Sequence, residues 1–221
     1  VLLVSAERPY SRMVLPYYLG RSIAESHVFT ATPARLAQWG VTAHVGRRAV
    51  ALDAKASTLT LDDGTVLAYD DCLIATGSSP VRLRIPGADG PGVHTFWTLD
   101  DAQGVMRQIA AGSHVVLVGA GFIAFTILNA ILSLGARLTI VEIAPRILPR
   151  MVDEAGAALV EAWLRREGVE VRTAATITAI EEAGGRRRLR FADGSEIAAD
   201  VVLMATGIKT NLEWLAGSGV R

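Results

Sequence analysis

Hydrophobic positions along the second half of this chain alternate between continuous apolar runs and helical spacing. An apolar run over 113–118 precedes a helical pattern over 122–134, and a second run over 138–142 precedes an amphipathic helix over 153–166. A further short strand is expected over 169–171. Strand, helix, strand, helix, strand is the order of a doubly wound parallel sheet, so the pattern predicts an α/β fold.

The remaining patterns predict shorter elements. Thr32 can cap a helix over 32–39, and Gly40 can end it. A helical turn over 15–19, closed by Gly20, a helix over 99–110 and a short helix over 211–215 are also predicted. Strands, including two β meanders, are expected over 1–5, 41–52, 58–61, 66–68, 71–75, 176–182, 187–191, 196–198 and 201–205.

One segment of the sequence occurs twice. Residues 58–77 and 188–207 align without a gap at an offset of 130 residues. Each copy reads as a hairpin that turns at Asp-Gly, followed by an apolar strand that ends in Ala-Thr-Gly. A turn-rich linker over 77–92 follows the first copy. We therefore predict two Rossmann-like doubly wound domains, 1–97 and 98–221, each with an antiparallel meander.

A glycine-rich turn follows the first apolar run of the second domain. Gly119 permits a tight turn, Gly121 lets the backbone approach a pyrophosphate, and the small Ala124 lets helix and strand pack. The amides of Phe122 and Ile123 open the helix, where free N–H groups and the helix dipole favour phosphate. The alternative is a turn that serves packing alone. The repeat offset would place the matching turn before the first residue, so the first domain is expected to be incomplete.

An acid lies where the ribose of a dinucleotide would be held. Glu142 ends the second strand, 23 residues after Gly119, and a carboxylate there can accept hydrogen bonds from ribose hydroxyls. It would repel a 2′-phosphate, which favours NADH over NADPH, although Arg146 could soften that repulsion. Gly207, at the end of the second Ala-Thr-Gly, is assigned to the same NAD site.

Composition excludes several classes of protein. The 221 residues carry 22 basic and 22 acidic side chains, so no global field attracts nucleic acid or an anionic membrane. Glycines divide the apolar stretch over 115–136, which we interpret as a strand and a buried helix rather than a membrane span. The single Cys72 is expected inside a strand and buried, and it excludes a disulfide within the chain, which fits a cytoplasmic protein. The four histidines lack the spacing of metal ligands.

These features together resemble a known family. The paired dinucleotide units, the two hairpins that lead to Ala-Thr-Gly, and the sequence over 141–149 resemble the FAD-dependent pyridine nucleotide-disulfide oxidoreductases. The stretch over 9–12 is similar to nitrite reductase large subunits and to ferredoxin and rubredoxin reductases. The resemblance implies that the first domain binds FAD, that the second binds NAD(H), and that hydride passes from nicotinamide to flavin. It also implies truncation at both ends, because the first glycine turn and a late Gly-Asp motif are absent.

The resemblance places FAD on the first domain. Glu7 closes the first strand as Glu142 closes its counterpart, so it is interpreted as the ribose acid of the FAD site, with a solvated surface charge as the alternative. Arg12 could bind the FAD pyrophosphate through two parallel hydrogen bonds, or be an ordinary surface arginine. The first Ala-Thr-Gly is also assigned to FAD, and it consists of Ala75, Thr76 and Gly77.

Departures from the family pattern narrow the chemistry. The stretch over 15–18 is similar to NADH oxidases and coenzyme A disulfide reductases, but Met13 stands where that branch has its redox cysteine. A thioether cannot form a disulfide, which disfavours a thiol-dependent reaction. Pro16 and Tyr17 replace a Ser-Lys pair of the ferredoxin reductases, and Thr126 replaces a glutamate common in the helix after the glycine turn. The sequence assigns no catalytic residue.

We therefore expect an FAD-dependent NAD(P)H oxidoreductase. It would oxidise NADH and pass electrons to an external acceptor such as an iron–sulfur or other metalloprotein, or to another domain of a longer chain. The alternative is a module that binds NAD(H) without turnover, as a sensor or scaffold. No nucleic acid, membrane or metal is expected as a partner. The sequence leaves the acceptor and the oligomeric state open, a homo-oligomer included.

Overall fold

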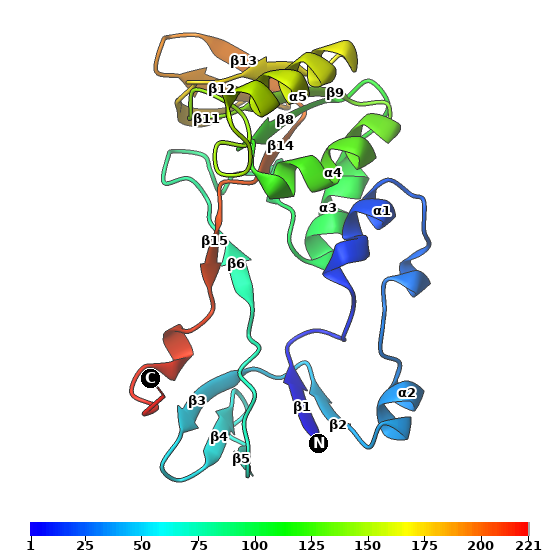
Figure 1. Cartoon of the computed structure of the whole chain (residues 1–221), viewed down its shortest axis with the longest axis vertical. Coiled ribbons are helices and arrows are strands. Elements are labelled where there is room, and N and C mark those ends of the chain that lie inside the picture. Colours follow the sequence, from blue (N-terminus) through cyan, green and yellow to red (C-terminus); the bar gives the residue numbers. More distant parts are fainter. Residues whose placement is uncertain (221) are drawn as a thin grey trace. The chain divides into compact units, whose positions relative to one another are not determined.

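The computed structural model describes residues 1–220, which form two compact units (Figure 1). The small unit comprises residues 1–11 and 25–79 together with the chain from Lys209, and the large unit comprises residues 12–24 and 80–208. Both units are discontinuous in sequence. The division into cofactor domains at residue 97 therefore stays a prediction, because the compact units follow a different course along the chain.

Five parallel strands form the central sheet of the large unit. In spatial order they are β10 (Glu170–Arg172), β9 (Arg137–Val141), β8 (His114–Val118), β14 (Val201–Met204) and β7 (Val93–Thr95). Most residues of β8 and β9 and all of β14 are buried, as parallel strands are when both faces of the sheet are covered. The predicted α/β fold with a parallel sheet is confirmed.

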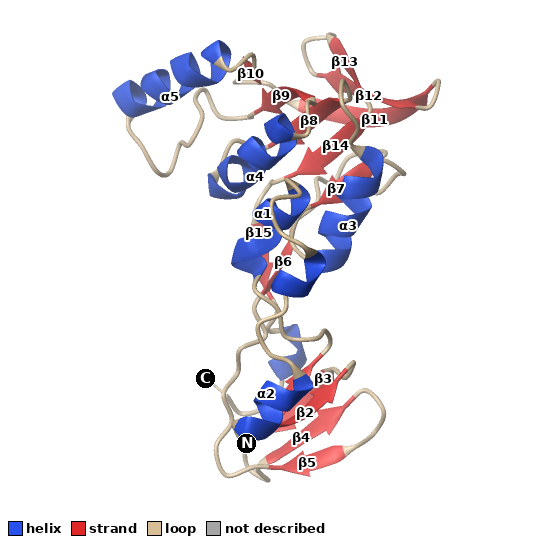
Figure 2. Cartoon of the chain, turned by 90° about the vertical axis from the view of Figure 1, so that its right-hand side faces the viewer, coloured by secondary structure: helices blue, strands red, loops and turns tan. Residues whose placement is uncertain are grey.

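Helices and a second sheet cover this parallel sheet (Figure 2). The helices are α3 (Leu99–Gln108), α4 (Phe122–Ser133) and α5 (Glu154–Arg166). The connections from β7 to β8, β9 and β10 all step in one direction, so right-handed crossovers place these helices on one face. The antiparallel strands β11 (Ile177–Ala183), β12 (Arg186–Phe191) and β13 (Glu196–Ala199) pack through Leu189 and Phe191 against Val116 and Val118 of β8. The second meander is therefore a layer of its own.

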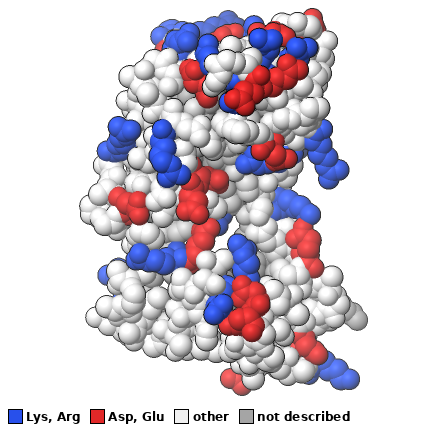
Figure 3. All heavy atoms as spheres, turned by 180° about the vertical axis from the view of Figure 1, so that it is seen from behind, with Lys and Arg blue, Asp and Glu red and all other residues white. Residues whose placement is uncertain are grey.

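The antiparallel sheet carries paired surface charges. Arg190 pairs with Glu181 and Glu196, and Arg188 also pairs with Glu196, and Figure 3 shows the two signs interleaved near its top. Exposed pairs of this kind contribute about 0–1 kcal/mol each. Within the basic run 186–188, Arg187 is only 8% exposed.

Side chains cap the first turns of two helices of the large unit, and a glycine is the N-cap of a third. Thr98 and Asp101 form a capping box at the start of α3, and the Asp153 side chain accepts a hydrogen bond from the Gly156 amide at the start of α5. The N-cap of α4 is Gly121, which has no side chain to satisfy the first amides. α4 has 12 residues, and no helix in the described chain is long and apolar enough to cross a membrane.

The small unit holds a parallel strand pair and the first meander. β1 (Leu2–Ser5) pairs with β2 (Thr42–Val45), and α2 (Pro33–Gln38) lies between them in sequence, capped by Thr32 as predicted. The meander consists of β3 (Ala49–Asp53), β4 (Thr58–Leu61) and β5 (Val66–Ala68). The predicted element over 41–52 is therefore two strands in two sheets.

The remaining helical elements of the two units are short. They are α1 (Leu15–Leu19), which Gly20 ends as predicted, and the 3-10 turns Arg12–Val14, Glu25–His27 and Glu213–Leu215.

The two sequence copies differ in structure at their last strand. In the second copy, β14 lies between β8 and β7, which bond to its backbone on both sides. In the first copy the strand predicted over 71–75 is wrong, because no strand of the described chain pairs with these residues. Leu73 is 91% exposed, and Cys72 is exposed rather than buried. An apolar segment becomes a strand only where neighbouring strands satisfy its N–H and C=O groups.

Three short strands lie where none was predicted. β7 forms an edge of the parallel sheet, and β6 (Ser78–Pro80) pairs with β15 (Ile208–Thr210). β6 and β7 fall at the two ends of the region interpreted as a turn-rich linker. Each of the three has only three residues, which is too short for periodicity to reveal it.

Candidate functional site

A cavity of about 1130 Å³ opens at the carboxyl ends of β8, β9 and β14. Every residue that lines it belongs to the large unit. Ligands of parallel α/β sheets bind at this edge, outside the carboxyl ends of the strands. The structure brings together here most of the residues predicted to bind cofactor, which are Gly119, Gly121, Phe122, Ile123, Glu142, Gly207 and Arg12.

The two glycines of the turn serve different purposes. Gly119 has φ +99°, and a β-carbon there would lie 2.5 Å from the carbonyl oxygen of Ala205, at the end of β14. Gly121 has ordinary extended dihedrals, and a β-carbon there would meet nothing within 4 Å. Gly119 is therefore required by the fold, whereas Gly121 leaves an open space at the cavity wall that fits the close approach of a phosphate.

The first turn of α4 faces the cavity with backbone donors. Phe122 and Ile123 line the cavity, and Phe122 is 60% exposed. The first N–H groups of a helix lack partners within the helix, and they attract anions. Ala124 does not line the cavity: it is fully buried, and its small side chain lets α4 pack on the sheet as predicted.

Glu142 lies directly after β9, and its carboxylate binds two backbone amides at the edge of the site. It is 8% exposed, and its Oε2 accepts a 2.7 Å hydrogen bond from the Ala120 amide, while Oε1 accepts a 2.9 Å hydrogen bond from the Ala144 amide. A carboxylate offers about four acceptor positions, so two stay open beyond these bonds, and Glu142 also lines the cavity. Glu142 therefore orders the glycine turn and can also accept from a ribose.

Arg146 does not lie where the sequence placed it. Its guanidinium donates to the backbone carbonyl oxygens of Val152 and Pro149, the latter at 3.0 Å. Arg146 is half-buried and does not line the cavity. Its position does not support the expectation that it offsets repulsion between Glu142 and a 2′-phosphate, because two of its five N–H donors bind backbone carbonyls and the side chain does not line the cavity.

Three arginines and Glu142 are the charged residues that line this cavity in the described chain. The arginines are Arg12, Arg84 and Arg150, which are all exposed and form no ion pair with another of the described residues. The Arg12 guanidinium lies 5.5 Å from the centre of the Trp97 ring, within cation–π distance. Most of the remaining wall is apolar, and it includes Met13, Phe96 and Leu148. An apolar cavity with a few cations suits a ligand that has both rings and phosphates.

Gly207 is held against the chain that leads into the large unit. Its φ is +119°, and its carbonyl oxygen accepts a 2.9 Å hydrogen bond from the Val81 amide. The neighbouring Thr206 hydroxyl donates to the Val81 carbonyl oxygen. These bonds fix the second Ala-Thr-Gly at the cavity wall.

The residues assigned to FAD divide between the units. Arg12 belongs to the large unit, whereas Glu7 and the first Ala-Thr-Gly belong to the small unit. Within the small unit, the Thr76 hydroxyl donates to the backbone carbonyl oxygen of Asn211, and the backbone amide of Asn211 donates to the carbonyl oxygen of Gly77. Ala75 is exposed and Glu7 is half-buried. Their assignment to FAD stays a prediction.

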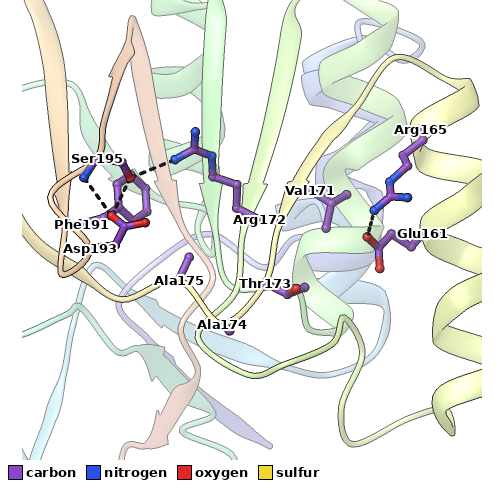
Figure 4. Close-up of a pocket in the computed structure, with 10 residues that line it drawn as sticks. All are labelled: Glu161, Arg165, Val171, Arg172, Thr173, Ala174, Ala175, Phe191, Asp193 and Ser195. Atoms are coloured by element: carbon purple, nitrogen blue, oxygen red, sulfur yellow. Dashed lines mark hydrogen bonds and ion pairs between the residues drawn. The ribbon is translucent and has the colours of Figure 1, made fainter.

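A second depression of about 430 Å³ lies between α5 and the hairpin of β12 and β13 (Figure 4). Its charged residues already have partners: Arg165 pairs with Glu161, Arg172 donates to Ser195, and Asp193 accepts from Ser195. The sign of charge is mixed. This depression therefore offers a cofactor less than the first cavity does.

His114 lies at the far end of β8 from the glycine turn. His114 contacts the Ala198 carbonyl oxygen at 2.9 Å and the Thr139 hydroxyl at 2.8 Å, and burial lowers its pKa below the usual 6.5. The pKa of Asp200 is lowered because its carboxylate accepts a hydrogen bond from the His114 amide. These groups stabilise the fold and do not line the cavity.

Sequence reasoning did not find several residues of the cavity wall. Trp97, Arg84 and Arg150 belong to no motif, and Leu148 lies in the stretch 141–149 but was assigned no role. All four reach the wall from connections between elements. Leu148 is unusual because it is a buried leucine with φ +47°. A sequence gives no signal for such a conformation in a residue other than glycine.

The parallel sheet, the glycine turn and the acid after β9 define a Rossmann-like α/β protein. The chain belongs to the pyridine nucleotide-disulphide oxidoreductase family, whose model matches residues 1–221. It is 32% identical over 215 residues to the NADH-dependent phenylglyoxylate dehydrogenase subunit epsilon of Aromatoleum evansii, covering 97% of this chain and 51% of that protein. It is 34% identical over 205 residues to the ferredoxin–NAD(+) reductase component of the p-cumate 2,3-dioxygenase system of Pseudomonas putida, covering 93% and 50%.

A solved structure of a ferredoxin reductase is also similar to this chain. The ferredoxin reductase for the CYP199A2 system of Rhodopseudomonas palustris matches with a TM-score of 0.93 and 25% identity, over 100% of this chain and 55% of that one. The chain spans about half the length of the curated relatives it matches.

Proposed function

We propose that this chain is the dinucleotide-handling part of an FAD-dependent NAD(P)H oxidoreductase that passes electrons to an external acceptor. The observation that carries the proposal is the open space at Gly121, where the uncapped start of α4 faces a cavity that Glu142 also lines. Membership of the family supports it. When bound, the nicotinamide supplies a hydride and the flavin accepts it and releases electrons to the acceptor.

The residues of the large unit would bind and orient the nicotinamide dinucleotide. The amides of Phe122 and Ile123, which line the cavity, would hold its diphosphate, since no side chain caps the start of α4. Ala124 would support them by letting the helix pack on the sheet. Glu142 would accept hydrogen bonds from the adenosine ribose with its two open acceptor positions. Gly207 would leave room for the ligand at the end of β14, because a β-carbon there would point into open space.

We further propose that the preferred dinucleotide is NADH. The Glu142 carboxylate favours a free 2′-hydroxyl and repels a 2′-phosphate. Arg146 gives no compensation, because its guanidinium is bonded to two backbone carbonyls. Arg150 is the cation of the same connection that lines the cavity, so tight NADPH binding would point to Arg150 and against the proposal.

FAD is proposed to use Glu7, Arg12, Ala75, Thr76 and Gly77. Arg12 fits an anion best, because its exposed guanidinium lines the cavity and stacks near Trp97. Gly77 has φ +64°, with open space where a β-carbon would lie. These features fit a cofactor that approaches the backbone closely.

The electron acceptor is proposed to be an iron–sulfur or other metalloprotein. Relatives are named ferredoxin–NAD(+) reductase and rubredoxin–NAD(+) reductase, which supports a protein acceptor. Met13 lines the cavity where a related branch has its cysteine, so the chain has no thiol there to relay electrons. With Cys72 as its one cysteine, the chain forms no internal disulfide, which supports our proposal that the protein is cytoplasmic.

The proposal is tested by titrating the purified full-length protein with NADH under anaerobic conditions. Flavin absorbance that bleaches on NADH addition and returns with an oxidised iron–sulfur protein supports the oxidoreductase. Nicotinamide binding without any flavin would favour a sensor or scaffold instead. A protein that binds neither would defeat both.

A further inference from the structure

We propose that Arg146 is a positioning residue that braces the dinucleotide-binding turn from behind the cavity wall. The inference rests on the proposed function, since it concerns the same site. Arg146 would not contact the ligand. Its side chain would instead stabilise the backbone that binds the phosphate.

The brace begins at the guanidinium. One terminal nitrogen of Arg146 donates to the Val152 carbonyl oxygen, and the other donates to the Pro149 carbonyl oxygen at 3.0 Å. A planar guanidinium can join two acceptors in fixed directions, whereas an ammonium is a point charge. Arg146 therefore closes the connection between β9 and α5 into a compact loop.

The loop encloses a strained residue. Leu148 has φ +47° and is 8% exposed, although bulky side chains rarely adopt this conformation. Such a residue persists only when its surroundings hold it in place. The Leu148 carbonyl oxygen accepts hydrogen bonds from the amides of Met151 and Val152 at 2.9 and 3.2 Å. The two carbonyls bound by Arg146, of Pro149 and Val152, belong to this same turn, so the guanidinium helps to hold Leu148 in its conformation.

Leu148 in turn holds the glycine turn. Its amide donates a 2.9 Å hydrogen bond to the carbonyl oxygen of Ala120, the residue between Gly119 and Gly121. The amide of the same Ala120 donates to Glu142 at 2.7 Å. Ala120 is thus held on both sides, by the ribose acid and by the strained leucine. A shift of the loop would move the turn and reorient the amides at the start of α4.

Preorganisation of this kind raises affinity by reducing the ordering that a ligand must impose. Removal of Arg146 is expected to loosen Leu148 and then Ala120, and to weaken dinucleotide binding without contact to the ligand. Arg146→Lys keeps the charge but cannot span both carbonyls, so it should resemble Arg146→Gln. A residue that acts by charge alone would be rescued by lysine.

The experiment uses the full-length protein with Arg146→Lys, Arg146→Gln and the control Arg166→Gln. Arg166 is an exposed residue of α5 that does not line the cavity. Amide hydrogen exchange at Ala120, Leu148 and Val152 is measured without nucleotide, and NADH and NADPH affinities are measured by titration. Both Arg146 variants should exchange faster at these amides and bind NADH about tenfold more weakly, as when a supporting shell is removed. The control should match the wild type.

Two results would overturn the brace. Unchanged exchange at Leu148 and Ala120 in both variants would show that Arg146 holds nothing. Loss of NADPH affinity alone, with NADH affinity intact, would show that Arg146 contacts a 2′-phosphate. If the wild type binds no nucleotide, the proposed function fails, and the exchange measurements still decide whether Arg146 orders the turn.

Discussion

Gly119 and Ala205 approach so closely that only a hydrogen fits between them: a β-carbon at 119 would lie 2.5 Å from the Ala205 carbonyl oxygen. The end of β8 is held here against the end of β14. The glycine turn therefore packs directly against the second Ala-Thr-Gly. Of the two glycines, Gly119 is required by the fold, and Gly121 is the one that we propose leaves room for the ligand.

Gly119→Ala is expected to destabilise the protein by more than about 1 kcal/mol, since the methyl group meets backbone and the residue has a positive φ. Urea unfolding followed by circular dichroism measures the change. An unaltered midpoint would contradict the close approach.

Gly121→Val is expected to lower stability by about 1 kcal/mol, because valine is a poorer N-cap than glycine, although its β-carbon would meet no protein atom within 4 Å. It should weaken NADH binding at least about tenfold by filling the space proposed for the diphosphate. Isothermal titration measures the affinity. Gly104→Ala in α3 serves as the control, since that β-carbon makes ordinary contacts away from the cavity. Normal NADH binding by the valine variant would exclude this site.

Trp97→Leu is expected to lower FAD affinity by about two- to tenfold, because Arg12 loses a cation–π contact of roughly 0.5–1 kcal/mol together with its fixed position. Trp97→Phe keeps a ring and should retain most of the affinity. Flavin fluorescence on dilution measures release. Trp163→Leu, on α5 and outside the cavity, controls for the loss of a tryptophan. Equal flavin release by all three variants would rule out the role of Trp97.

The pH dependence of stability should include a contribution from His114. Burial lowers its pKa in the folded protein below 6.5, so the unfolded chain binds more protons as the pH falls through that region. The stabilisation is complete above about pH 6.5 and is lost as the pH falls towards the lowered value. Urea unfolding at about pH 7.5 and 5.5 should show a smaller difference in His114→Gln than in the wild type. His27→Gln, which removes an exposed histidine, should behave as the wild type.

Cys72 should react in the native protein. The structure exposes it beside the 91% exposed Leu73, whereas the sequence pattern predicted a buried strand. A chromogenic disulfide reagent should therefore titrate one thiol without denaturant, at a rate close to that in urea. Protection until unfolding would show that segment 71–75 is covered and that the strand prediction was right.

The predictions that succeeded depended on local physics. Thr32, Gly20 and the turn at 119–124 act through their own backbone geometry, and each was found where the sequence placed it. Glu142 was found at the end of its strand for the same reason. Arg146 failed, because four residues beyond a strand end a side chain can turn to either side of a loop. The orientation of the Arg146 side chain depends on two backbone carbonyls that no sequence motif identifies.

The repeat shows where sequence stops determining structure. Residues 58–77 and 188–207 share one pattern, and the sequence alone established the hairpins, the glycine turn and the order of strands and helices. Only the tertiary structure made residues 201–204 a strand and left residues 72–75 without strand pairing. The reason is that hairpins and caps close their hydrogen bonds within a few residues, whereas a sheet strand needs partners from distant parts of the chain. β14 finds them in β7 and β8, and the described chain provides none beside residues 72–75.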